Sequence, residues 1–196
     1  LKTPLTVILT NAELLQEPEY DEQARSRFVD SIMTMSRQMR GLVESLLELA
    51  RVDNGGQNMV FSRLNFSELV SDALLPFEPV YFEKGLTLES NVEENLFVKG
   101  SQQHLKQVAD ILLDNASKYA SADSTVRVIL RRQGSHCLLS VASAGDAISK
   151  EDLKNIFKRF YRMDKARSMN HSYGLGLSIA RLLTEKMGGS IDAAYS

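Results

Sequence analysis

The chain of 196 residues contains one cysteine, no tryptophan and no long apolar run. A single cysteine, Cys137, cannot form an intrachain disulfide, so we expect a reducing compartment, and a cysteine-rich zinc site is excluded. No stretch approaches the roughly 18 apolar residues of a membrane-spanning helix. Basic charge is not in excess either, because 23 Lys and Arg stand against 25 Asp and Glu, for a net charge of −2. We therefore expect no nucleic-acid partner and no polybasic membrane surface.

The composition that remains is that of a globular protein, with 43% hydrophobic and 24% charged residues. The sequence begins at Leu1 rather than Met, and its end at Ser196 falls within a segment that is typical of a strand. We therefore expect a piece of a longer protein, truncated at both ends, with any membrane anchor in segments outside this chain.

Helical periodicity dominates the first 50 residues. Between residues 25 and 50, apolar side chains follow alternating steps of four and three residues, which is the heptad pattern of a coiled-coil seam. These positions are Phe28, Ile32, Met35, Met39, Leu42, Leu46 and Leu49. Residues 1–15 also have helical spacing, and Pro18 lies in the break that follows them. We expect a helical hairpin that pairs with a second copy as a dimeric four-helix bundle. The alternative is that the hairpin packs on its own second domain.

The pattern changes at residues 53–58, Asp-Asn-Gly-Gly-Gln-Asn, which is typical of a linker. We place one domain at residues 1–54 and another at 58–196. The second mixes helical and strand periodicity, which favours an antiparallel or mixed sheet layered with helices. Its predicted helices cover residues 66–81 (interrupted by Pro76 and Pro79), 103–119, 152–160 and 178–187, and its predicted strands cover 86–91, 96–99, 125–132, 136–142 and 190–195.

One candidate site for a phosphate-bearing ligand is the pair Asn115 and Lys118, which share a face of the predicted helix. An amide oxygen can bind a hard cation such as Mg²⁺, and an ammonium group can contact phosphate oxygens. The alternative is an ordinary exposed helix end.

A second candidate is Gly174-Leu175-Gly176-Leu177, which precedes a predicted helix. Glycines let backbone N–H groups approach an anion closely, and the helix presents its positive N-terminus. A P-loop and a dinucleotide-binding turn are both excluded, because no Gly-Lys-Ser/Thr follows and no βαβ unit precedes. The alternative is a flexible turn.

A third candidate is Phe157-Lys158-Arg159-Phe160-Tyr161-Arg162, followed by a polar run to Tyr173 that could form a lid. Arg162, Lys165 and Arg167 could hold phosphates. The alternative is a solvated basic loop.

In this order and spacing, these groups resemble the motifs of the histidine kinases of two-component signalling. Leu1-Lys2-Thr3-Pro4-Leu5 resembles the end of the phosphotransfer motif, residues 113–119 the N box, 157–162 the F box and 174–177 the second glycine box. The resemblance covers almost the whole chain. It implies a dimeric helical hairpin followed by a Bergerat-type α/β sandwich that binds ATP.

The resemblance also implies roles for individual residues. Asn115 would bind Mg²⁺, Lys118 and Arg162 would face phosphates, Tyr119 would lie against the nucleotide, and residues 163–173 would form the lid. The ATP-binding set that it implies is Asn115, Lys118, Tyr119, Ser143, Gly145, Ala147, Ile148, Arg162, Tyr173, Gly174, Leu175, Gly176 and Leu177. Thr3 would orient water for dephosphorylation of the partner; the alternative is that it only precedes a kink at Pro4.

The sequence departs from the family pattern in three places. The phospho-accepting histidine is expected two residues before Leu1, and none of His104, His136 and His171 fits its place. Ser143 stands where the family has an adenine-reading aspartate, and Ser172 where glycine is usual. A hydroxyl is a weaker, uncharged acceptor, so we expect weaker or water-mediated contact with adenine.

The implied activity is ATP-dependent autophosphorylation of a histidine, phosphotransfer to an aspartate in the receiver domain of a response regulator, and a phosphatase activity. The implied setting is the cytoplasmic portion of a bacterial membrane protein that forms homodimers. Two alternatives remain open: a catalytically degenerate relative that dimerises and docks a regulator, and another ATPase of the same superfold.

Overall fold

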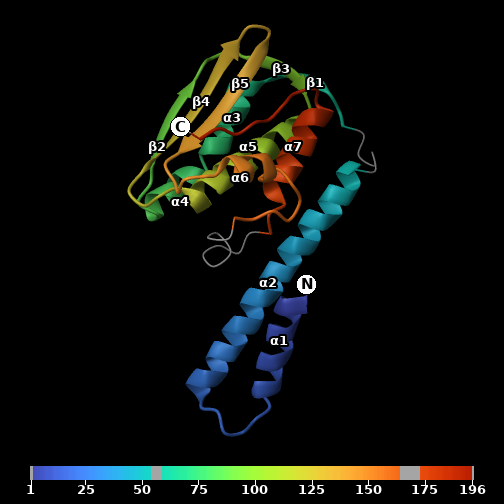
Figure 1. The fold of residues 1–196 in the computed structure, drawn as a ribbon, viewed down its shortest axis with the longest axis vertical. Coiled ribbons are helices and arrows are strands. Elements are labelled where there is room, and N and C mark those ends of the chain that lie inside the picture. The colour runs from blue at the N-terminus through green and yellow to red at the C-terminus, as the bar shows by residue number, and fades with distance from the viewer. Residues whose placement is uncertain (1, 54–58, 164–172, 196) are drawn as a thin grey trace. The chain divides into compact units, whose positions relative to one another are not determined.

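A computed structural model describes residues 2–53, 59–163 and 173–195 of the chain (Figure 1). Internal contacts divide the chain into two compact units, Leu1–Gly56 and Gln57–Ser196. The first unit is helical, and the second combines helices with two small sheets.

The first unit is a hairpin of two helices, α1 (Lys2–Leu14) and α2 (Glu22–Asp53), which lie side by side. The Asp21 carboxylate accepts a hydrogen bond from the Ala24 amide at 2.7 Å and so caps the start of α2. Tyr20, in the turn, packs edge to face on Phe28 with ring centroids 5.1 Å apart. The predicted helical hairpin is thus confirmed.

Two apolar rows run along this hairpin. Five residues of the predicted seam are half-buried: Phe28, Ile32, Met35, Met39 and Leu46. A second row remains 43–54% exposed and consists of Leu5, Leu9, Val29, Met33, Val43 and Leu47. One hairpin alone therefore leaves large apolar side chains of both helices uncovered.

The second unit contains two sheets among its described residues. Strands β1 (Ser62–Asn65) and β3 (Phe97–Gly100) form an antiparallel pair. Strands β2 (Thr87–Val92), β4 (Thr125–Gln133) and β5 (His136–Ser143) form a sheet in the order β2-β4-β5. Because β2 pairs parallel with β4 while β5 pairs antiparallel with it, the predicted mixed sheet is confirmed.

Strand β4 follows the alternation of apolar and charged residues in its sequence. Val126, Val128 and Leu130 are at most 1% exposed, whereas Arg127 and Arg131 are exposed. Successive side chains of a strand point to opposite faces, so the apolar set enters the core.

Helices cover the inner face of this sheet (Figure 1). Those that contact its strands are α3 (Phe66–Leu74), α4 (Phe77–Glu83) and α5 (Gln102–Tyr119). Two further helices are α6 (Lys150–Asn155) and α7 (Gly176–Lys186), and α7 packs on α5. Val70, Tyr81 and Leu113 of α3, α4 and α5 join the β4 valines in one buried cluster. Helix α5 lies centrally, against α3, α4, α7 and β5.

Three predicted elements differ from the structure. Residues 66–81 form two helices: the predicted interruption at Pro76 is confirmed, whereas the one predicted at Pro79 is wrong, since Pro79 lies in the first turn of α4. The predicted helix 152–160 ends at Asn155, and turns follow it. The strand predicted at 190–195 is wrong: no strand is formed there among the described residues, since no neighbouring strand pairs with them.

Candidate active site

The last two turns of α5 carry the first candidate group. The helix begins after Ser101, whose hydroxyl lies 2.8 Å from Nδ1 of the buried His104. This histidine therefore has a structural setting, in agreement with its exclusion as the phospho-acceptor. Asn115, Lys118 and Tyr119 are half-buried near the other end of the helix.

The second glycine group lies beside this part of α5. Gly176 is the first residue of α7, and a Cβ added to it would lie 3.3 Å from Cγ2 of Ile111. Ile111 is one helical turn before Asn115, so the two residues share a face of α5. The structure thus brings the diglycine bend next to the helix face that carries Asn115.

Gly174 connects this bend to the F-box segment. Its φ is +67°, and a Cβ there would overlap the Tyr161 carbonyl group. The Phe160 amide also donates a hydrogen bond to the Gly174 carbonyl at 2.9 Å. Phe160 itself has a φ of 64°, a left-handed conformation that is uncommon outside glycine. Two segments separated in sequence are therefore held in direct backbone contact.

The altered first glycine box lies at the C-terminal end of α5. Strand β5 ends at Ser143, and the next carbonyl, of Ala144, accepts a hydrogen bond from the Ser121 amide at 2.8 Å. A Cβ added to Gly145 would lie 3.0 Å from the Tyr119 carbonyl oxygen. Both glycine groups thus contact the second half of α5, and the F-box segment contacts the second of them.

The remaining predicted site residues differ in how far they are exposed to solvent. Ser143, Gly145 and Ala147 are exposed, and Ile148, Arg162, Tyr173, Gly174 and Leu177 are half-buried. Leu175 is 2% exposed, so a ligand contact from this residue in the present structure would come from its backbone. Residues 164–172, with Lys165, Arg167, His171 and Ser172 of the predicted lid, lie outside the described residues. Thr3 is exposed on α1, in the other unit.

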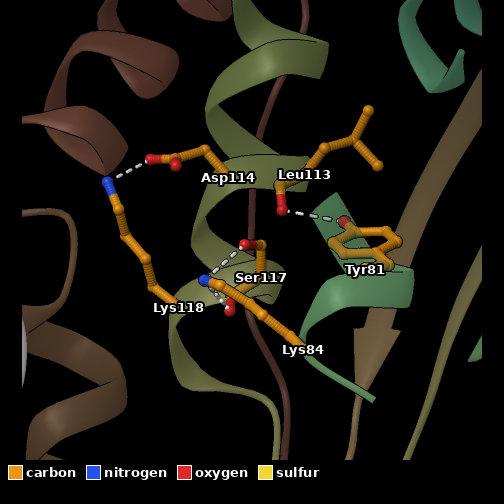
Figure 2. A network of polar contacts seen from close by, with 6 residues as sticks. All are labelled: Tyr81, Lys84, Leu113, Asp114, Ser117 and Lys118. Atoms are coloured by element: carbon orange, nitrogen blue, oxygen red, sulfur yellow. Dashed lines mark hydrogen bonds and ion pairs between the residues drawn. The ribbon is translucent and has the colours of Figure 1, made fainter. Parts of the chain in front are cut away.

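Lys118 does not point freely to solvent. Its ammonium group forms an ion pair with the Asp114 carboxylate, four residues earlier on α5 (Figure 2). A phosphate group would therefore compete with Asp114 for this cation. Asp114 is not among the predicted site residues, although the spacing of four residues between opposite charges on a helix predicts such a pair.

Two further residues support α5 and were not predicted. Tyr81, from α4, and Lys84, which caps the end of α4, donate hydrogen bonds to α5 (Figure 2). Burial and the nearby Asp114 charge raise the pKa of Tyr81 to about 12, so its hydroxyl stays protonated and can donate. No sequence periodicity links residues 32 or more positions apart, and only the fold could show these contacts.

The F-box segment is attached to the start of α6. Ser149 caps that helix by accepting from the Asp152 amide at 3.0 Å. The Asp152 carboxylate accepts hydrogen bonds from the Ser149 and Tyr161 hydroxyls. These bonds lower the pKa of Asp152 and, in return, raise the pKa of Tyr161. Tyr173 directly precedes Gly174 in the sequence, and its hydroxyl is buried. This burial raises the pKa of Tyr173.

Comparisons with known families agree with this arrangement. Residues 1–55 match the His Kinase A (phospho-acceptor) domain, and residues 100–195 match the histidine kinase-, DNA gyrase B- and HSP90-like ATPase. A phospho-acceptor hairpin followed by this type of ATPase defines a class of signalling protein. The chain belongs to the sensor histidine kinases of two-component systems.

Relatives from streptococci align along nearly the whole chain. The sensor protein DltS of Streptococcus agalactiae is 31% identical over 193 residues, which cover 98% of this chain and 48% of DltS. The sensor protein CiaH of Streptococcus pneumoniae is 32% identical over 193 residues, which cover 97% of this chain and 43% of CiaH. The chain therefore spans about half the length of the curated relatives that it matches.

Solved structures show the same fold. ShkA in complex with AMPPNP has a TM-score of 0.75 at 23% identity, covering 99% of this chain and 40% of ShkA. ThkA in complex with the response regulator TrrA has a TM-score of 0.75 at 20% identity, covering 96% of this chain and 52% of ThkA. Among the helices in the described residues, none is long and apolar enough to span a membrane.

Proposed function

We propose that this chain is the catalytic core of a histidine kinase, with a dimerisation and phosphotransfer hairpin at residues 1–54 and an ATP-binding domain at 58–196. It would phosphorylate a histidine from ATP and pass the phosphoryl group to an aspartate of a response regulator. The observation that carries the proposal is the meeting of three separated segments at α5, near Asn115, Gly145 and Gly176. ShkA binds AMPPNP and ThkA binds the regulator TrrA, which supports both halves of the proposal.

The residues present suit a nucleotide with a magnesium ion. Within residues 2–53, 59–163 and 173–195, no three His, Cys, Asp or Glu side chains gather as a metal site. A Mg²⁺ ion held by the Asn115 amide oxygen and by phosphates requires no such group. A Cβ added at Gly145 or Gly176 would make a tight contact of 3.0 or 3.3 Å with α5, and glycine at these positions allows backbone to lie close to a ligand.

Each predicted site residue then has a proposed task. Asn115 would hold Mg²⁺, which when bound neutralises charge on the phosphates. Lys118, after leaving Asp114, and Arg162 would bind phosphate oxygens, and Tyr119 would lie against the nucleotide. The segment Ser143, Gly145, Ala147 and Ile148 would contact adenine, while residues Tyr173, Gly174, Leu175, Gly176 and Leu177 would supply backbone N–H groups at the start of α7.

Dimerisation through the hairpin is part of the same proposal. The exposed row of Leu5, Leu9, Val29, Met33, Val43 and Leu47 needs an apolar partner. A second hairpin offers a matching surface and completes a four-helix bundle. We further propose that the chain is the cytoplasmic portion of a membrane-anchored sensor, with its anchor in segments outside it.

The proposal is tested with the full-length protein. Incubation with Mg²⁺ and γ-labelled ATP should give phosphate that is labile in acid and stable in alkali, and a receiver domain added afterwards should acquire the label. The exposed Ser143 favours one competing function, a docking module without catalysis. Absence of both analogue binding and labelling would support that competitor.

Substitution of Ser143 by aspartate is expected to tighten ATP binding about ten-fold. A carboxylate can accept a charge-assisted hydrogen bond from the exocyclic amine of adenine, which is stronger than the bond to a hydroxyl. The affinity for GTP, which presents a carbonyl oxygen at that position, should not rise. Competition with a fluorescent ATP analogue gives both affinities, and Ser135→Asp, at the exposed β4–β5 turn, is the control. Equal gains for ATP and GTP would remove the adenine-contacting role.

Substitution of Thr3 by alanine is expected to lower regulator dephosphorylation at least ten-fold, while autophosphorylation stays within about two-fold. Thr3 is exposed on α1, so its removal leaves helix packing intact. Thr6→Ala is the control, since the Thr6 hydroxyl donates to the Lys2 carbonyl at 3.0 Å within the same helix. The rates are measured by following labelled regulator. A parallel loss of both activities in Thr3→Ala would contradict the assignment.

A further inference from the structure

Helix α5 receives three long-range hydrogen bonds, one from Tyr81 of α4 and two from Lys84, the residue that follows α4 (Figure 2). The Tyr81 hydroxyl donates to the Leu113 carbonyl oxygen at 2.8 Å. The Lys84 ammonium group donates to both the carbonyl oxygen and the hydroxyl of Ser117, each at 2.9 Å. Leu113 and Ser117 are four residues apart and therefore lie on the same side of α5. The three bonds thus act on one side of the helix, at two residues that are one turn apart.

The opposite side of α5 carries the candidate metal ligand. Each residue of an α-helix is rotated by about 100° from the preceding one. Asn115, two residues from both Leu113 and Ser117, therefore points away from the side that α4 contacts. Lys84 contacts the side of α5 opposite to Asn115, and it is not among the residues proposed to touch the nucleotide.

The last turn of α5 has carbonyl groups that require hydrogen-bond donors from outside the helix. The last four carbonyl groups of a helix have no partner within it, and α5 ends at Tyr119. Ser117 is 6% exposed, so water cannot readily replace a lost hydrogen bond there. A cation is also favourable at this end of the helix dipole. Gly85, with a φ of +68°, ends α4 directly after Lys84 and leads the chain into β2.

The end of α5 also contacts the first glycine box. The Tyr119 carbonyl oxygen lies against Gly145, and the Ser121 amide binds the Ala144 carbonyl at 2.8 Å. Movement of this turn would therefore displace Asn115 and the glycine box together.

We propose that Lys84 is a positioning residue of the nucleotide site, which fixes the last turn of α5 by binding Ser117. The proposal rests on the proposed function for its consequence, the affinity for nucleotide. Its structural part, the ordering of the last turn by Lys84, holds whether or not a nucleotide binds.

Amide hydrogen exchange of the nucleotide-free chain tests the structural part. In Lys84→Met, amides of residues 117–121 should exchange at least about ten-fold faster, because both hydrogen bonds from the Lys84 ammonium group to Ser117 are lost. Amides of residues 106–110 on the same helix should be unchanged. Lys84→Arg should restore slow exchange, because its guanidinium group can still donate to Ser117. Unchanged exchange, equal acceleration along all of α5, or no rescue by arginine would overturn the proposal.

Binding of AMPPNP with Mg²⁺ tests the functional part. Lys84→Met should raise the dissociation constant at least about ten-fold, because both charged hydrogen bonds to Ser117 are lost, and Lys84→Arg should raise it less than about three-fold. Lys106→Met is the matched control, because this α5 lysine forms an exposed pair with Asp110 in the first half of the helix. An equal loss in the control, or no loss in Lys84→Met, would overturn the positioning role. A wild-type chain without measurable binding would instead overturn the proposed function, and the exchange result would still decide whether Lys84 orders the turn.

Discussion

Replacing Asn115 with alanine is expected to reduce binding of AMPPNP with Mg²⁺, and autophosphorylation of the full-length protein, by at least about 100-fold. The amide oxygen is the only proposed protein ligand of the metal, so its loss leaves the phosphate charge without its main neutralising partner. Asn115 is half-buried on the side of α5 opposite to the α4 contacts, and alanine favours helix, so the fold should be retained. Calorimetric titration and labelling with γ-labelled ATP measure the two effects.

Gln103→Ala is the matched control for this variant. Gln103 is an exposed amide in the first turn of the same helix, remote in sequence from the glycine groups. Its removal should change binding by less than two-fold and leave the melting temperature within about a degree of the wild type. Wild-type affinity in Asn115→Ala would show that the metal-binding role belongs elsewhere.

Replacing Gly174 with alanine is expected to destabilise the second unit by at least about 2 kcal/mol and to weaken AMPPNP binding at least ten-fold. The φ of +67° is strained for alanine, and the added Cβ would overlap the Tyr161 carbonyl group. Relief of that overlap requires the F-box segment and the start of α7 to separate, which displaces Gly176 from Ile111. Urea unfolding measures the stability, and titration measures the binding.

Gly134→Ala is the control that separates the backbone strain at a positive φ from the steric overlap of the added Cβ. Gly134 has a similar φ of +62°, in the β4–β5 turn, but a Cβ there would meet nothing within 4 Å. This control should lose only about 1 kcal/mol of stability, the conformational contribution, and should bind AMPPNP as the wild type does. Equal effects of the two substitutions on binding would contradict the proposed contact between the F-box segment and the glycine bend.

Periodic segments of this fold were predictable because each buries one face. The heptad row that includes Phe28 and Ile32 is half-buried in the hairpin, and the alternating valines of β4 are almost completely buried. Residues 190–195 show where sequence periodicity fails to predict an element. A strand requires a neighbour with which to share hydrogen bonds, and alternation in the sequence does not supply one.

The candidate site was predictable where chemistry is carried by neighbours in sequence. Asn115 with Lys118, and Gly174 with Gly176, are each defined by short spacings. Their mutual approach was inferred from a family resemblance, and the Gly176–Ile111 contact agrees with it. The contacts of Lys84 with Ser117 could not be foreseen, because they join α4 to α5 across 33 positions of sequence.

The contacts of the two glycine groups with α5 have a thermodynamic consequence. A ligand that holds these segments together would bind the folded unit and not the unfolded chain. Saturation at 100 times the dissociation constant would then add about 2.7 kcal/mol to the free energy of unfolding. Heat denaturation of residues 57–196 would therefore report ligand occupancy directly, and compounds that occupy the site could be ranked by their effect on the melting temperature before any phosphorylation is measured.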